Sequence, residues 1–185
     1  MQINQWLKQA VNKLSKEIGT AQLDAEVMLA DVLKVDRSWV HSHHEDDLPN
    51  ENLKLLSGYV ERRLSHEPMA YILGKTEFYG RDFYITNDVL VPRPESETMI
   101  EVLKKYCTDG HLEDIFLVDC GTGSGALVIT ATLEIEPSKS LAIDIDEKCL
   151  KAAKQNIEKY SLNIELIKSN LLDGILGRDL SSYNL

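Results

Sequence analysis

The sequence has no long apolar run and comparatively few basic residues. No stretch approaches the ~20 apolar residues of a membrane span, and residues 1–6 do not begin a signal peptide, because no basic region is followed by a long apolar stretch. We therefore expect no membrane association. The 20 Lys and Arg residues stand against 30 Asp and Glu residues, which gives a formal net charge of -10. Such a surface is poorly suited to direct nucleic-acid binding.

Cysteine is also scarce. The three cysteines, Cys107, Cys120 and Cys149, are far apart and odd in number. This usage excludes a disulfide framework and predicts reduced thiols in or near the core of a cytoplasmic protein.

A metal site is not expected either. His41, His43 and His44 precede three acidic residues at 45–47, but their spacing matches no closed zinc pattern and no cysteine is near. We interpret this segment as a solvent-exposed helix end and loop.

The first 74 residues predict a small helical bundle. Apolar residues recur at helical spacing from Ile3 to Ile18. Thr20 and Asp36 are placed to cap a second and a short third helix, and Pro49 to open a fourth. In the second helix, Leu23, Val27, Leu29, Ala30 and Leu33 are the expected buried positions.

The pattern changes to a β-rich one near Glu67. We predict a β-hairpin over residues 75–92, with a turn at Asn87-Asp88, that links two domains. Pro94 then suits the first turn of a helix. We interpret Arg93 as a surface residue, and the inward face of the helix as Met99, Ile100, Leu103 and Tyr106.

A glycine-rich turn organises the remainder of the chain. A short β-branched run at 115–118 predicts a buried strand. Gly121, Gly123 and Gly125 follow at alternate positions, and a helical pattern begins at Ala126. Strand, glycine turn and helix together predict a nucleotide site, although a tight turn without ligand remains an alternative.

Two acidic residues bear on the identity of the ligand. Asp119 lies just before the first glycine, where a carboxylate repels a pyrophosphate and attracts an ammonium group. Asp144 ends a second predicted strand, where it can accept hydrogen bonds from ribose hydroxyls. Asp144 alone suits NAD or S-adenosylmethionine, and Asp119 favours S-adenosylmethionine.

A third predicted strand, 163–167, is followed by Asn170 and Leu171. These residues lie at the strand's carboxyl end, where open α/β sheets bind ligands. Asn170 can bond the edge of an adenine and Leu171 can pack on its face, although Leu171 and Leu172 are equally compatible with core positions.

Four segments together resemble the HemK-type protein-(glutamine-N5) methyltransferases. They are Glu67-Pro68-Met69-Ala70-Tyr71-Ile72-Leu73-Gly74, Glu77-Phe78-Tyr79-Gly80, Val91-Pro92-Arg93-Pro94-Glu95-Ser96-Glu97, and the stretch Asp119 to Gly125. The resemblance covers essentially the whole chain in the same order.

The resemblance implies an α/β fold, an activity and a site. We expect a helical substrate-recognition domain (1–74), a linking β-hairpin (75–92), and the first half of a class I, Rossmann-like, S-adenosylmethionine-dependent methyltransferase fold (93–185). The implied reaction methylates the glutamine of the Gly-Gly-Gln loop of peptide chain release factors. The implied cofactor-binding residues are Asp119, Gly121, Thr122, Gly123, Ser124, Gly125, Asp144, Asn170 and Leu171.

The catalytic signature of that family, Asn-Pro-Pro-Tyr, does not occur in this sequence. We therefore expect the N-terminal part of a longer enzyme, inactive alone, with the cofactor half of the site and no catalytic residue. Its first strand would be left as a sheet edge, through which copies could self-associate. The alternatives are a non-catalytic cofactor-binding fragment, a methyltransferase acting on nucleic-acid amino groups and an NAD-dependent oxidoreductase, the last two disfavoured by the net charge and by Asp119, respectively.

Overall fold

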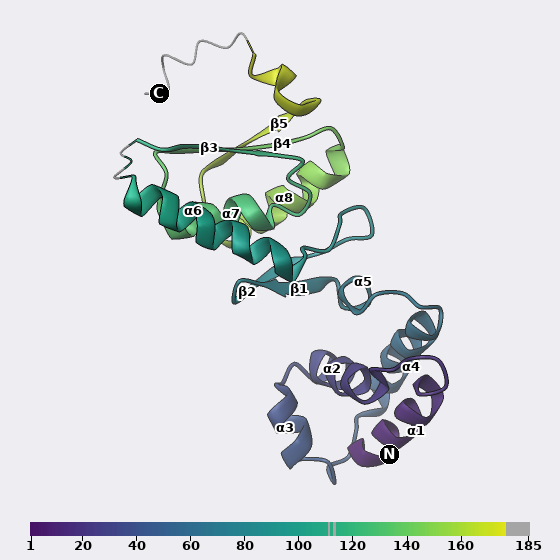
Figure 1. Cartoon of the computed structure of the whole chain (residues 1–185). Helices are drawn as coiled ribbons and strands as arrows, with labels where there is room; N and C mark the ends of the chain where they lie inside the picture. The colour runs from purple at the N-terminus through teal and green to yellow at the C-terminus, as the bar shows by residue number, and fades with distance from the viewer. Residues whose placement is uncertain (111, 113, 177–185) are drawn as a thin grey trace. The chain divides into compact units, whose positions relative to one another are not determined.

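Helices form the first of the two units into which the chain divides, Met1–Leu73 (Figure 1). In this computed structural model, residues 1–110, 112 and 114–176 are described. The helices of this unit are α1 (Ile3–Leu14), α2 (Ala21–Leu33), α3 (Arg37–Ser42), α4 (Asn50–Leu64) and α5 (Met69–Leu73).

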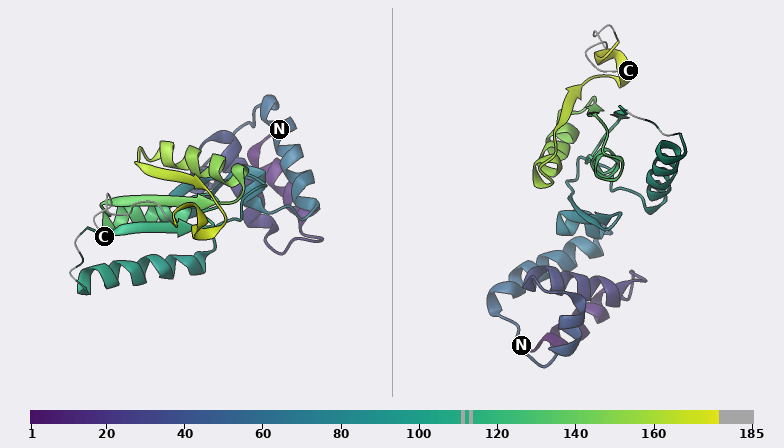
Figure 2. Two further views of the ribbon diagram at one scale, coloured as in Figure 1. Left: turned by 90° about the horizontal axis from the view of Figure 1, so that it is seen from above. Right: turned by 90° about the vertical axis from the view of Figure 1, so that its left-hand side faces the viewer.

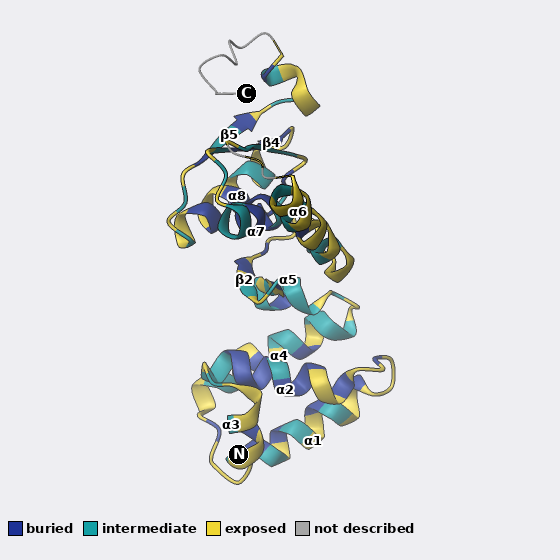
Figure 3. Cartoon of the chain, turned by 60° about the vertical axis from the view of Figure 1, so that its left-hand side comes forward, coloured by how far each residue is buried: buried dark blue, intermediate teal, exposed yellow. Residues whose placement is uncertain are grey.

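Helix α2 is the centre of the first unit, and it contacts α1, α3, α4 and α5. Most of it is buried (Figure 3). The prediction that Leu23 is buried is wrong, since this side chain is 44% exposed, while the neighbouring Asp24 and Glu26 are buried. The reason is that arginines on α4 and α3 pair with these two acids, so the buried surface of α2 is not a single apolar stripe.

The predicted caps have different outcomes. Asp36 accepts a hydrogen bond from the Trp39 N–H at 2.6 Å, which confirms it as the cap of α3. Thr20 occupies the position before α2, but its hydroxyl donates to Asp24 Oδ2 at 3.0 Å instead of capping the helix.

The second unit, Gly74–Leu185, contains a parallel three-stranded sheet with the strand order β3-β4-β5. Helices α7 and α8 connect its strands, and Figure 2 shows them on the same side of the sheet as α6. On the other face, Leu141, Ile143 and Ile167 form an apolar cluster with Ile175. The elements are β1 (Lys75–Phe78), β2 (Arg81–Tyr84), η1 (Pro94–Ser96), α6 (Glu97–Asp109), β3 (Phe116–Cys120), α7 (Ala126–Ile135), β4 (Lys139–Asp144), α8 (Glu147–Lys159), β5 (Ile164–Lys168) and η2 (Leu171–Gly174).

This topology confirms the predicted fold class. Strand, glycine turn, helix, strand, helix and strand follow one another, and all three strands are parallel. That order is the first half of a Rossmann-like sheet. Among the helices of the described ranges, none combines the length and apolar character that crossing a bilayer requires.

The β-hairpin is shorter than predicted. Strands β1 and β2 pair from Lys75↔Tyr84 to Phe78↔Arg81, so the turn between them is Tyr79-Gly80. Both turn residues have positive φ, 53° and 70°, which suits a two-residue hairpin. Asn87-Asp88 also forms a turn, as predicted, but it follows the paired strands, and in it the Val89 N–H donates to the Thr86 carbonyl at 3.2 Å. The aromatic ring of Phe83 is buried against Tyr160, with centroids 5.5 Å apart.

Helix α6 exposes residues that the sequence pattern placed inside. Only Ile100 is fully buried, and Met99 and Tyr106 are 60% and 68% exposed. The reason is that α6 packs on α7 and leaves a groove of about 580 Å³ between itself, α7 and β3. Among the described strands, β3 pairs only with β4, so its other edge is open. Self-association through this edge stays a prediction.

The cysteines only partly match the expected location in or near the core. Cys120 is exposed, and Cys107 and Cys149 are half-buried, so none belongs to the core. All three are free thiols. Cys120 is exposed because it ends β3, the strand with the open edge.

Candidate functional site

The glycine turn is held against the end of the neighbouring strand. The N–H groups of Gly121 and Thr122 both donate to the carbonyl of Ile143 in β4, at 2.8 and 3.0 Å. Gly121, Gly123 and Gly125 have φ of 80°, 54° and 80°, a conformation that other residues rarely adopt. The backbone of the loop is therefore fixed before any ligand arrives.

The three glycines face different surroundings. A Cβ atom added at Gly121 or Gly123 would have no neighbour within 4 Å. One added at Gly125 would lie 3.2 Å from Ile129 Cδ1 and 3.3 Å from Ala153 Cβ. The first two glycines thus border open space that a ligand can enter, whereas the third allows α7 to begin close against α8.

Asp144 supports the loop directly. Its side chain is buried, Oδ2 accepts from the N–H of Gly123 at 2.9 Å, and Oδ1 accepts from the N–H of Asp146 at 3.0 Å. Each carboxylate oxygen has a second acceptor position. Asp144 can therefore orient the loop and still accept a hydrogen bond from a ligand hydroxyl.

Asp119 approaches the loop from the end of β3. Its Oδ2 accepts from the Thr122 hydroxyl at 2.7 Å. Burial raises the pKa of the Asp119 carboxyl, and the negative charge of Asp144 adds to this, while bonds from Thr122 and from the backbone of Val128 act in the opposite direction. A ligand cation would remove this electrostatic penalty.

Asn156 is a site residue that the sequence analysis missed. It is completely buried on α8, and its Nδ2 donates to the carbonyls of Ser124 and Tyr84, at 2.9 and 3.0 Å. Its Oδ1 accepts from the Tyr84 N–H at 2.8 Å. The available signal was an amide on the inward face of α8, between Ala153 and Ile157. Asn156 joins the glycine loop to the end of the hairpin.

The segment before α6 was also missed. Residues Leu90, Val91, Pro92 and Arg93 line a cavity of about 130 Å³, which they share with the loop 121–124 and with the start of α7. The sequence analysis treated Arg93 as a surface residue; its side chain is indeed exposed, but at the rim of this cavity. The sequence feature that could have indicated this position is an arginine between two prolines, which restrict the backbone on both sides of it.

Asn170 and Leu171 lie at the same sheet edge as Asp144, because the N–H of Ser169 donates to the Asp144 carbonyl at 3.0 Å. Neither side chain lines the 130 Å³ cavity. Leu171 is 67% exposed and Leu172 43%, so the alternative that they are core residues is wrong. Leu171 also has a positive φ of 48°.

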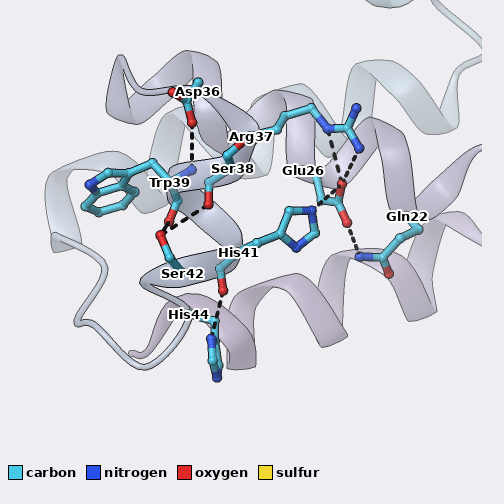
Figure 4. A network of polar contacts seen from close by, with 9 residues as sticks. All are labelled: Gln22, Glu26, Asp36, Arg37, Ser38, Trp39, His41, Ser42 and His44. Atoms are coloured by element: carbon cyan, nitrogen blue, oxygen red, sulfur yellow. Dashed lines mark hydrogen bonds and ion pairs between the residues drawn. The ribbon is translucent and has the colours of Figure 1, made fainter.

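The three histidines of the first unit have separate partners. His41 Nε2 lies 3.4 Å from Glu26 Oε2, while Nδ1 of His44 bonds the carbonyl of His41 (Figure 4). His43 stacks on Trp39 at a centroid distance of 4.1 Å. No group of three His, Cys, Asp or Glu residues suited to a metal ion occurs within the described part of the chain.

The chain is similar to release factor glutamine methyltransferases over both units. Residues 5–74 match the PrmC N-terminal domain, and residues 95–178 match ribosomal protein L11 methyltransferase (PrmA). The release factor glutamine methyltransferase of Coxiella burnetii is 37% identical over 84% of this chain and 57% of its own length. That of Bacillus subtilis is 36% identical over 85% of this chain and 55% of its own length.

Similarity of structure extends to other methyltransferases. The N-terminal domain of human METTL16 in complex with SAH matches 92% of this chain and 60% of that chain, with a TM-score of 0.47 and 14% identity. The chain spans a little more than half the length of the curated relatives it matches. The comparisons confirm the resemblance of this chain to the release factor glutamine methyltransferases.

Proposed function

We propose that this chain supplies the cofactor-binding part of an S-adenosylmethionine-dependent methyltransferase that modifies a glutamine of peptide chain release factors. The observation that carries the proposal is a glycine loop in open space between Asp119 and Asp144, neither of which pairs with a cation among the described residues. The similarity to release factor glutamine methyltransferases supplies the substrate.

The residues present fit this cofactor. Asp119 would hold the methionine ammonium, and Asp144 would accept hydrogen bonds from the ribose hydroxyls. The backbone at Gly121 and Gly123 would contact the ligand where no side chain intervenes, flanked by Thr122, Ser124 and Gly125. Exposed Asn170 and Leu171 would meet the adenine edge and face. When bound, the cofactor supplies an electrophilic methyl group on sulfur.

The glutamine amide is a weak nucleophile, because its nitrogen lone pair is delocalised into the carbonyl. Its methylation depends on orientation and on acceptors for its two N–H bonds. The Asn-Pro-Pro-Tyr segment that would provide them does not occur in this sequence. We therefore expect this chain to bind the cofactor without methylating a Gly-Gly-Gln peptide.

The helical unit would recognise the release factor, since its five helices contain no candidate catalytic group and residues 5–74 match a distinct domain. We expect a cytoplasmic protein that contacts a protein substrate, with no direct contact to nucleic acid. A net charge of -10 supports this preference.

Calorimetric titration of the 185-residue chain with S-adenosylhomocysteine tests the cofactor assignment, with NAD as the rival ligand. We expect Asp119→Asn and Asp144→Asn each to weaken S-adenosylhomocysteine binding about tenfold or more, since a charge-assisted hydrogen bond contributes about 1.5–3 kcal/mol. Asp109→Asn, at the exposed end of α6, is the matched control. Tighter binding of NAD, or unchanged affinity in both variants, would overturn the assignment.

Retention of the chain on immobilised release factor, compared with retention on immobilised DNA, tests the proposed partner.

A further inference from the structure

Arg93 differs from the other arginines that the structure describes. Four of them form ion pairs with carboxylates, at distances of 2.5–2.9 Å. These are Arg37 with Glu26, Arg62 with Glu67, Arg63 with Asp24 and Arg81 with Glu134. Arg93 pairs with no carboxylate among the described residues, and it is exposed. Its guanidinium, with five donors in a planar fork, is therefore available to an external anion.

The position of Arg93 directs this anion to the glycine loop. The residue lines the 130 Å³ cavity together with residues 121–124. Its backbone is held between Pro92 and Pro94, and its carbonyl accepts from the Ser96 N–H at 2.9 Å at the start of η1. The side chain thus extends from a restrained backbone beside the proposed cofactor site.

A positive charge lines this cavity, and a carboxylate is hydrogen-bonded to one of its lining residues. Thr122, a lining residue, donates its hydroxyl to Asp119, whose pKa is raised by burial. Arg93 is the cationic lining residue. Asp119 does not line this cavity itself; it lines the neighbouring groove between α6, α7 and β3, and Thr122 connects it to the cavity. An acid suited to an ammonium and an arginine suited to a carboxylate, on either side of Thr122, match a zwitterion, that is, an amino-acid group with one ammonium and one carboxylate.

We propose that Arg93 binds the carboxylate of the amino-acid part of S-adenosylmethionine, while Asp119 holds its ammonium. This inference rests on the proposed cofactor. It explains why a charged residue stands between two prolines ahead of the nucleotide fold. It also assigns a specificity: the site discriminates in favour of ligands that retain the carboxylate.

A ligand pair that differs only in the carboxylate tests this assignment. We expect the 185-residue chain to bind S-adenosylmethionine about tenfold or more tightly than decarboxylated S-adenosylmethionine, as measured by calorimetry. In Arg93→Gln the two ligands should bind with nearly equal affinity. Lys151→Gln, which removes a positive charge from the exposed face of α8, should keep the wild-type ratio.

The ratio of the two affinities separates the possible failures. A uniform loss in Arg93→Gln, with the ratio unchanged, would show that Arg93 does not contact the carboxylate. The same conclusion follows if the wild-type chain binds S-adenosylmethionine and decarboxylated S-adenosylmethionine with equal affinity. If the wild-type chain binds neither ligand, the proposed cofactor itself is wrong. Because the ratio compares two ligands on one variant, partial unfolding of the variant does not change it.

Discussion

Carboxylates are buried in both units, but they have different partners. In the helical unit, Asp24 pairs with Arg63 at 2.6 Å and Glu26 with Arg37 at 2.9 Å. In the second unit, Asp119 and Asp144 have no cationic partner among the described residues; they accept from the Thr122 hydroxyl, from backbone N–H groups and, for Asp144, from the Cys149 thiol. The carboxylates of the helical unit are neutralised by arginines of the same unit and stabilise it. The carboxylates of the second unit retain a charge that a ligand can neutralise.

The pKa directions express the same contrast. Burial raises the pKa of Glu26, but bonds from Gln22 and Arg37, and the charges of His41 and Arg37, outweigh burial and leave the pKa below its ordinary value (Figure 4). For Asp119, burial dominates and the pKa is raised. An acid that neighbouring cations keep ionised has a structural role, because its charge is already compensated within the fold. An acid whose ionisation is disfavoured has no such compensation, so it is available to a cationic ligand.

The largest effect is expected from breaking the Asp24–Arg63 pair. Arg63→Ala leaves the Asp24 carboxylate buried without a cation, and it also removes a bond to the carbonyl of Glu67. We expect a loss of about 3 kcal/mol in the free energy of unfolding of the helical unit, measured by urea denaturation with circular dichroism. S-adenosylhomocysteine affinity should be unchanged.

Lys34→Ala is the control for this first prediction. Lys34 lies 3.5 Å from Asp31, but its side chain is 76% exposed, so we expect a loss below about 0.5 kcal/mol. If both variants unfold alike, the ion pairs of α2 do not stabilise this unit as described.

Asn156 gives the second largest effect and tests the inner support of the glycine loop. Asn156→Ala leaves the carbonyl of Ser124 and both backbone groups of Tyr84 without this partner. We expect the second unit to lose about 2 kcal/mol, since each unsatisfied buried group costs about 1–3 kcal/mol and rearrangement recovers part of this. Gln155→Ala, on the exposed face of the same helix, should cost little. Equal effects of the two substitutions would show that Asn156 does not support the loop.

Protonation of Asp119 provides the third test. The ammonium ligand requires the ionised carboxylate, so affinity for S-adenosylhomocysteine should fall about tenfold as the pH is lowered through the raised pKa of Asp119, which lies above the ordinary value of 3.8. Without ligand the sign is opposite: a raised pKa contributes stability at low pH that is lost as the pH rises through it. Asp119→Asn should therefore not destabilise the free chain at neutral pH.

The pH profile of calorimetric affinity checks this prediction, and Asp119→Asn is the matched variant. The profile of the variant should be nearly flat over the range in which the wild-type chain loses affinity. A variant that retains the wild-type profile would assign the titration to another group.

The sequence predicted the elements of the site better than their support. Strand, glycine turn and helix are local patterns, so the loop 121–125 and the acids Asp119 and Asp144 could be placed at strand ends without a structure. Asn156 was not predicted because its partners are 32 and 72 residues away. Leu23 was misplaced for a similar reason: helical periodicity does not show that arginines of other helices satisfy the acids next to it.

The smallest expected effect concerns Leu171, the exposed apolar residue after β5. Its position at the sheet edge, 67% exposed with φ of 48°, leaves the side chain without a place in the core. If it packs on the adenine, Leu171→Phe should improve S-adenosylhomocysteine affinity several-fold, because an aromatic ring stacks on a base with about 1–3 kcal/mol relative to alanine. Leu172→Phe is the matched control beside it. Calorimetry should show no gain for Leu172→Phe and no change in the urea midpoint for either variant. A gain at Leu172 alone would place the adenine against the other leucine, and a gain at neither would remove this edge from the proposed site.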